Sequence, residues 1–146
     1  MSEEMQLHLL FSKLTIDFET ALEEFFQEYK LTTTRFVILN LLYNSPEGMT
    51  PTETAKAVGV TNATISAIIS NLKQAGWIQP QQNVGDSRSY RIVLSETGLE
   101  LMKKVLPVYN ENISRLWSQF NSDERRNLGN LMTRMSQLVG VMGKNI

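Results

Sequence analysis

The stretch from Thr50 to Leu94 constrains the fold most, because it places a glycine between two short helical segments and follows them with a hairpin pattern. Thr50 and Glu53 have the spacing of a capping box, and Pro51 suits the first position of a helix. Gly59 can take the left-handed conformation that ends a helix without steric cost. We therefore predict a short helix, a tight turn at Gly59 and a second helix.

The second helix should begin after Thr61, a suitable N-cap, and run to about Ala75. Its apolar residues recur at helical spacing on one stripe, made of Ile65, Ile68, Ile69 and Leu72. Two helices joined by such a turn form a helix-turn-helix, whose second helix can lie in the major groove of DNA. Its outward face carries small and polar side chains that can contact base edges or phosphates. The predicted contacts are Asn62, Ala63, Thr64, Ser66, Ala67 and Ser70, followed by Lys73, whose cation can meet a phosphate.

A β-hairpin pattern follows Gly76. One strand is expected from Trp77 toward Gln82, with Pro80 favouring an edge strand, and the return strand spans residues 89–94. A short strand before the first helix, at residues 49–50, could pair with this hairpin. A helix-turn-helix followed by a hairpin is a winged helix, so the pattern predicts that arrangement.

The turn of this hairpin supplies a second group of predicted DNA contacts: Asp86, Ser87 and Arg88, with Arg91 on the return strand. An arginine near a hairpin tip suits a narrow minor groove, where A·T tracts concentrate negative potential. Asp86 can bond to the loop amides or to Arg88 and so hold Arg88 in position. The alternative is a merely structural hairpin, but an arginine at a tip has little packing role.

The composition excludes several classes of chemistry. The 146 residues include no cysteine and one histidine, which removes disulfides, thiol switches, cysteine zinc sites and a histidine-rich metal site within one subunit. No glycine-rich phosphate loop and no catalytic spacing of nucleophile and base appears. We therefore expect neither an enzyme nor a bound cofactor.

The charge is unevenly distributed. The net charge is −1, yet residues 1–30 hold seven acids and two bases, whereas residues 50–94 hold four bases and two acids. A weakly basic DNA-contacting region predicts modest nonspecific affinity for nucleic acid. No apolar run is long enough to span a bilayer, so we expect a cytoplasmic protein without a membrane partner.

The two ends of the chain are expected to form apolar helices. The first, about Glu4 to Tyr29, leaves Ile16 and Phe26 off its main stripe, so two of its faces are candidates for burial. The main stripe comprises Leu7, Leu10, Phe11, Leu14, Phe18, Leu22, Phe25 and Tyr29. Another helix should follow, ending near Tyr43.

After the hairpin, Ser95 is the expected cap of a long helix in which Pro107 predicts a kink or a break. Asn121 and Glu124 have capping-box spacing and predict the start of the last helix. The terminal helices are more apolar than a chain of this size needs. They predict a helical dimer interface shared by two copies.

This order of parts resembles the MarR family of winged-helix transcriptional regulators. The resemblance covers nearly the whole chain and is carried by Leu31-Thr32 with Phe36, the run 55–76, and Asp86-Ser87-Arg88-Ser89 leading into residues 94–98. It implies a mostly α fold with a small β-wing, in a single chain spanning 1–146. The winged-helix lobe would be 31–94, and the helical dimerisation region would be 1–30 with 95–146.

The resemblance also implies a function: a homodimer that binds a pseudo-palindromic site on double-stranded DNA, usually as a repressor released by a small-molecule effector. The family's wing aspartate and arginine match Asp86 and Arg88. The effector would bind between the dimer helices and the DNA-binding lobe. The alternative from another class is a winged-helix module that binds a protein and no DNA.

Overall fold

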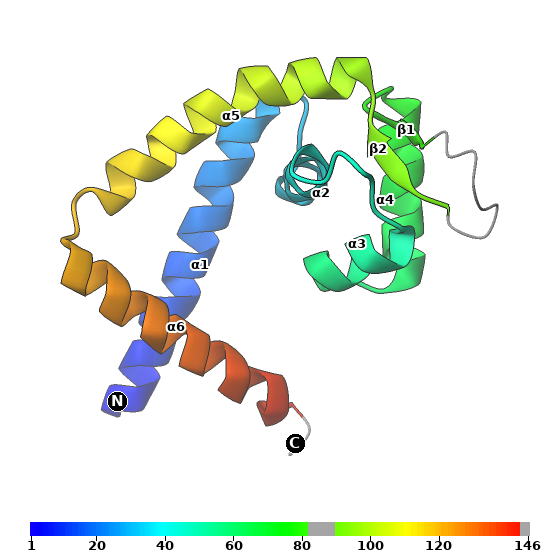
Figure 1. Ribbon diagram of the computed structural model, residues 1–146. Helices are drawn as coiled ribbons and strands as arrows, with labels where there is room; N and C mark the ends of the chain where they lie inside the picture. The colour runs from blue at the N-terminus through cyan, green and yellow to red at the C-terminus, as the bar shows by residue number, and fades with distance from the viewer. Residues whose placement is uncertain (82–89, 144–146) are drawn as a thin grey trace. The chain divides into compact units, whose positions relative to one another are not determined.

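The computed structural model describes residues 1–81 and 90–143, and these contain the helices and strands labelled in Figure 1. Their order is α1 Glu3–Gln27, α2 Thr33–Tyr43, α3 Pro51–Val58, α4 Asn62–Gln74, β1 Ile78–Pro80, β2 Ile92–Leu94, α5 Glu96–Trp117 and α6 Ser122–Met142. The chain separates into two compact units, Met1–Val105 and Leu106–Ile146, and α5 contributes to both. The mostly α fold with a small β-hairpin agrees with the sequence prediction.

Local hydrogen bonds explain where α3 and α4 begin and end. Thr50 Oγ1 accepts from the Glu53 amide at 3.1 Å, and the Glu53 carboxylate accepts from the Thr50 amide at 3.2 Å, which confirms the capping box. Gly59 ends α3 with φ at 85°, in the left-handed region that glycine adopts without strain. Thr61 Oγ1 accepts from the Thr64 amide at 3.1 Å and starts α4. The predicted helix-turn-helix is therefore present.

The core of the first unit is built mainly from α2, α3, α4 and the two strands. Phe26, near the end of α1, joins this core by stacking on Phe36 of α2, with ring centroids 4.7 Å apart. Phe26 is the buried residue of α1, although it lies off the main apolar stripe. The buried apolar residues are Phe26, Leu31, Phe36, Ile38, Leu39, Leu42, Ala55, Ile65, Ile69, Leu72, Ile78, Ile92, Met102 and Val105.

The sheet is a short antiparallel pair in which Ile78 faces Leu94 and Pro80 faces Ile92. Met49 adds an isolated bridge to Ile92, which confirms the predicted pairing ahead of α3. Both strands are shorter than expected from the sequence. The first ends at Pro80, and just beyond it the Gln81 amide still donates to the Arg91 carbonyl at 2.8 Å.

The start of α5 is tied to the end of α4. Ser95 Oγ accepts from the Gly98 amide at 3.0 Å, as the cap predicted from the sequence, and donates to the Gly76 carbonyl at 2.5 Å. The Ser95 amide donates to the Trp77 carbonyl at 3.0 Å. One serine thus begins α5 and fastens it to the turn that follows α4.

The second unit contains the rest of α5 and all of α6. The helix continues through Pro107, so the predicted alternative of a break there does not occur. Arg125 Nη1 donates to the carbonyls of Trp117 and Phe120, at 3.1 and 2.8 Å, and holds the turn between the helices. The Asn121–Glu124 capping box is confirmed, with bonds of 2.9 and 3.0 Å.

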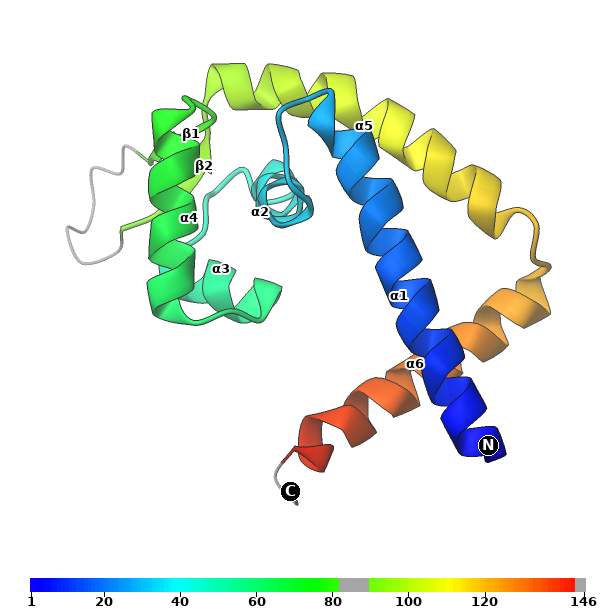
Figure 2. The same cartoon turned by 180° about the vertical axis from the view of Figure 1, so that it is seen from behind.

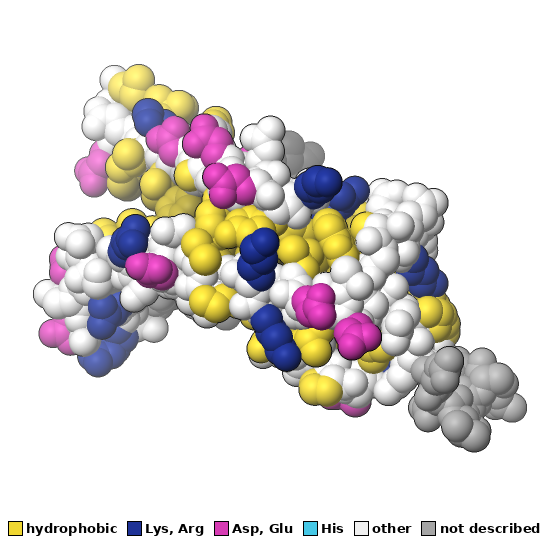
Figure 3. Space-filling view, turned by 90° about the horizontal axis from the view of Figure 1, so that it is seen from above, with side chains coloured by type: hydrophobic (Ala, Val, Ile, Leu, Met, Phe, Trp, Pro, Cys, Tyr) yellow, Lys and Arg dark blue, Asp and Glu magenta, His cyan; other side chains and the backbone are white. Residues whose placement is uncertain are grey.

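Many large apolar side chains of α1 and α6 are exposed in the single chain, and Figure 3 shows hydrophobic side chains reaching the surface among charged ones. None of the described side chains of α6 is buried. The exposed large apolar side chains of α1 are Met5, Leu7, Leu9, Leu10, Phe11, Leu14, Ile16 and Phe18. Those of α6 are Leu128, Leu131, Met132, Met135, Leu138, Val139, Val141 and Met142.

Candidate nucleic-acid interface

The helix α4 turns one polar face to solvent. It packs on α3 and β1 through Ile65, Ile69 and Leu72. The two opposite views in Figures 1 and 2 both show α4 next to the strands. All seven residues predicted on its outward face, from Asn62 to Lys73, are exposed. The structure therefore brings these side chains together on one accessible surface.

Two of these polar side chains have local partners within α4. Ser66 Oγ donates to the Asn62 carbonyl at 2.9 Å, and Thr64 Oγ1 accepts from Thr61 Oγ1 at 2.9 Å. Such bonds fix the rotamers of short side chains and leave hydroxyl lone pairs free to accept, and the Asn62 residue is exposed. Asn62 lies in the first turn of α4, the part of a recognition helix that contacts base edges in helix-turn-helix proteins.

Lys73, predicted as a phosphate contact, lies against Tyr90. Its ammonium group donates to the Tyr90 hydroxyl and stands 4.6 Å from the centroid of the ring. Cations over aromatic faces are attracted by the ring quadrupole. This contact links the last turn of α4 to the segment entering β2, which the sequence pattern did not indicate.

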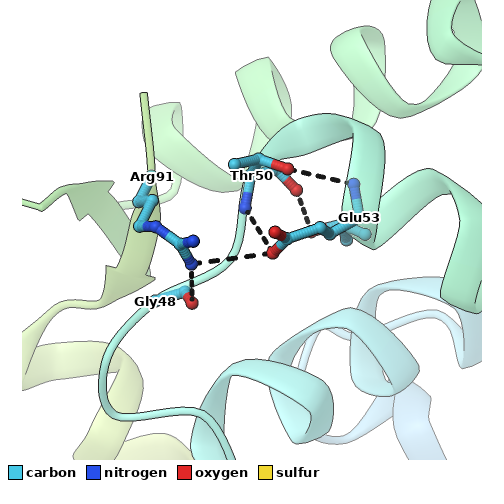
Figure 4. A network of polar contacts seen from close by, with 5 residues as sticks. Gly48, Thr50, Glu53 and Arg91 are labelled. Carbon is cyan, nitrogen blue, oxygen red and sulfur yellow. Dashed lines mark hydrogen bonds and ion pairs between the residues drawn. The ribbon is translucent and has the colours of Figure 1, made fainter. Parts of the chain in front are cut away.

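Arg91, also predicted to contact DNA, directly precedes β2, at the end of the strand pair that faces the turn (Figure 4). Its Nη1 donates to the Gly48 carbonyl at 3.0 Å and stands 3.6 Å from Glu53 Oε2. Its side chain is 31% exposed, against 49% for Glu53. Gly48 precedes Arg91 by 43 positions, and no sequence pattern links the two residues. The ion pair with Glu53 could have been suspected only from the opposite charges of the two side chains.

The remaining predicted contacts, Asp86, Ser87 and Arg88, lie outside the described residues. Their assignment to DNA stays a prediction from the sequence. The described candidates are thus the seven residues on the outward face of α4, which include Lys73, and Arg91 next to β2.

A cleft of about 510 Å³ lies in the first unit, between the C-terminal part of α1 and the start of α2. Its polar lining includes Glu19, Glu23 and Lys30, followed by the threonines 32–34. The family resemblance implied an effector site in this region, between a dimer helix and the DNA-binding lobe. The lining residues themselves were not predicted, because they come from two helices and the turn between them. Among the described residues, no cluster of three or more acidic, histidine or cysteine side chains could hold a metal ion. None of the helices described is both long and apolar enough to cross a membrane.

Comparison with known proteins gives consistent relatives. The model of the MarR family matches residues 31–90. The chain is 30% identical over 128 residues to the HTH-type transcriptional regulator PecS of Dickeya dadantii, covering 86% of this chain and 77% of that protein. It is 27% identical to the HTH-type transcriptional repressor YetL of Bacillus subtilis, covering 90% and 82%.

Solved structures show the same fold. The MepR protein of S. aureus, in a complex with DNA, superposes with a TM-score of 0.84 at 22% identity, covering 94% of this chain and 99% of that one. A MarR/EmrR family regulator from Acinetobacter gives a TM-score of 0.80 at 19% identity, covering 97% and 100%.

Proposed function

This chain belongs to the MarR family of transcriptional regulators, and from that premise we propose that it binds double-stranded DNA in a sequence-specific manner and represses transcription. The observation that carries the proposal is the outward face of α4, where seven exposed small, polar or basic side chains lie together. Such a face can enter a major groove without steric conflict.

In the proposed complex, Asn62 supplies base recognition, since an asparagine can make a bidentate contact to adenine. Ser66 and Ser70 bond to bases or phosphates, and the Ala63 and Ala67 methyl groups contact thymine methyl groups. Arg88 enters the flanking minor groove, with Asp86 orienting it and Ser87 beside it. The last three assignments rest on the sequence.

We propose that the working form is a homodimer, which places two α4 helices on a pseudo-palindromic operator. The support is the exposed apolar surface of α1 and α6. Each of these helices by itself exposes eight large apolar side chains, and monomeric proteins rarely expose large contiguous apolar patches. A twofold axis would let the same residues of both copies cover each other.

We further propose that a small molecule releases the DNA. The cleft between α1 and α2 is large enough for a ligand of moderate size, and it is next to the exposed part of α1. Glu19 and Glu23 outnumber Lys30 along its wall, which favours a cationic over an anionic effector. Tetraphenylphosphonium and benzoate serve as cationic and anionic aromatic probes, and only the first should lower DNA affinity.

The test is a titration of the full chain against the DNA upstream of its own gene, beside a scrambled duplex, at several salt concentrations. We expect operator binding at least about 1,000-fold tighter than binding to the scrambled duplex at physiological salt. Equal, weak binding to both duplexes would contradict the proposal. It would favour the alternative, a winged-helix module that binds another protein.

A further inference from the structure

Arg91 joins the start of β2 to the start of α3. Its guanidinium contacts the Gly48 carbonyl and the Glu53 carboxylate, which both belong to the segment that enters α3 (Figure 4). Building on the proposed function, we propose that Arg91 is a positioning residue, which fixes the hairpin against the helix-turn-helix and does not itself neutralise a phosphate.

The first support is that Glu53 is held in place by a second interaction. The carboxylate oxygen Oε2 that faces Arg91 also accepts from the Thr50 amide at 3.2 Å, as part of the capping box. Thr54, buried beside it, donates from Oγ1 to the Thr50 carbonyl at 2.9 Å. The cap fixes this carboxylate relative to α3. An ion pair between Arg91 and the carboxylate therefore holds the hairpin in a fixed position relative to α3.

The second support is how little other backbone bonding joins the two parts. Met49 and Ile92 form a single isolated bridge, in which each amide donates to the other carbonyl, at 3.0 and 2.8 Å. Arg91 directly precedes Ile92 in the chain, so its side-chain contacts lie next to this bridge. A single bridged pair is a weak connection, and the arginine adds two contacts to it.

The third support is the close approach of Gly48 to β2. Gly48 has φ at +87°, and a Cβ there would stand 3.0 Å from the Ile92 carbonyl oxygen and 3.1 Å from Val93 Cγ1. Only a residue without a side chain fits this position easily. Its backbone carbonyl is thereby brought within reach of Arg91.

The charge of Arg91 is also largely compensated. A phosphate that approaches the guanidinium would meet the Glu53 carboxylate beside it, and attraction and repulsion would nearly cancel. The geometry therefore favours a structural connection over a DNA contact.

The test uses Glu53→Gln and Arg91→Gln in the full chain. The glutamine at 53 keeps an oxygen that can accept from the Thr50 amide, so the cap survives while the ion pair is removed. Both variants should weaken operator binding by about 3- to 10-fold, because each removes two exposed ion pairs per dimer, with an unchanged slope of log affinity against log salt.

A phosphate contact predicts different results. Arg91→Gln would then reduce that slope by about 0.9 for each phosphate that the arginine neutralises, and Glu53→Gln would leave binding unchanged or tighten it by removing an acid. Either result would overturn the inference. Arg126→Gln is the matched control, because it removes the same charge from an exposed ion pair with Asp123 on α6.

Amide hydrogen exchange gives a readout that needs no DNA. Exchange at Met49 and Ile92 should be faster in both variants than in the wild type, and unchanged in Arg126→Gln. Equal protection in all four proteins would overturn the inference even if the wild type binds its operator. Faster exchange together with no operator binding by the wild type would instead contradict the proposed function alone.

Discussion

Gly98 packs directly on the backbone of Trp77, so that a Cβ at position 98 would overlap the Trp77 carbonyl oxygen. The same carbonyl accepts from the Ser95 amide at 3.0 Å. The first turn of α5 thus lies on the turn that ends α4, and neither can move without the other. A backbone atom cannot be displaced as a flexible side chain can, so this position should tolerate only glycine.

Gly98→Ala should therefore lower the free energy of unfolding by about 2 kcal/mol, as for other overpacked sites. The melting temperature should fall by roughly 4–8 °C. Gly129→Ala is the control, since a Cβ there would meet nothing within 4 Å and α6 should gain helix propensity. If both alanine variants melt at or above the wild-type temperature, the close contact with Trp77 does not exist in solution.

Lys30 adopts a left-handed conformation, with φ at 58°, in the turn after α1. Its amide donates to the Gln27 carbonyl, and the Leu31 amide donates to the Phe26 carbonyl, both at 3.1 Å, as in a Schellman motif. Lys30→Gly should stabilise the protein by about 0.5–1 kcal/mol, because glycine adopts this conformation without steric cost. Lys30→Ala removes the same side chain but keeps the strain, so chemical denaturation should show no comparable gain for it.

The sequence predicted the local features of the fold well. Capping at Thr50, Thr61, Ser95 and Asn121 depends on residues three positions apart, and each predicted cap is present. Contacts between segments that are distant in the chain could not be predicted from the sequence. The burial of Phe26 in place of the main stripe of α1 depends on where α2 passes, and no periodicity encodes that.

The candidate interface shows the same division. Exposure of the α4 face follows from the burial of Ile65 and Leu72 on the opposite side, which helical spacing predicts. The partners of Lys73 and Arg91 lie 17 and 43 positions away along the chain. A cation that contacts a tyrosine or a glutamate has the same local sequence pattern as one that contacts a phosphate, so only the structure reveals these partners.

Base recognition by α4 can be tested with Asn62→Ala and Ser66→Ala. Asn62→Ala should reduce the ratio of operator to scrambled-DNA affinity about 10-fold or more, because a good bidentate base contact contributes about 1–3 kcal/mol of discrimination. Ser66→Ala should reduce the ratio less, because a serine hydroxyl makes no bidentate contact. Binding to the scrambled duplex and its salt dependence should stay as in the wild type. Asn130→Ala, on α6, removes an equivalent exposed amide as the control, and an equal drop in affinity for both duplexes would assign these residues to the DNA backbone.

The dimer can be tested at α6. Leu138 is 62% exposed in the single chain, and in the proposed dimer its substitution by aspartate would bury a charge. Leu138→Asp should shift the protein toward monomers in sedimentation velocity, whereas Asn130→Asp, away from the apolar stripe of this helix, should not. A dimer that survives Leu138→Asp unchanged would place the interface elsewhere.

Helix α6 has 21 residues and, among its described side chains, none that a single chain buries. Most helical stability in proteins comes from packing of an apolar face, so in the proposed dimer α6 would acquire most of its stability from a second copy. In the proposed homodimer, folding of this part then depends on how many copies the cell makes, and its melting temperature should rise with protein concentration. A scarce, newly made chain would offer an apolar, fraying end to proteases. Its lifetime, and with it the onset of regulation, would depend on its own rate of synthesis.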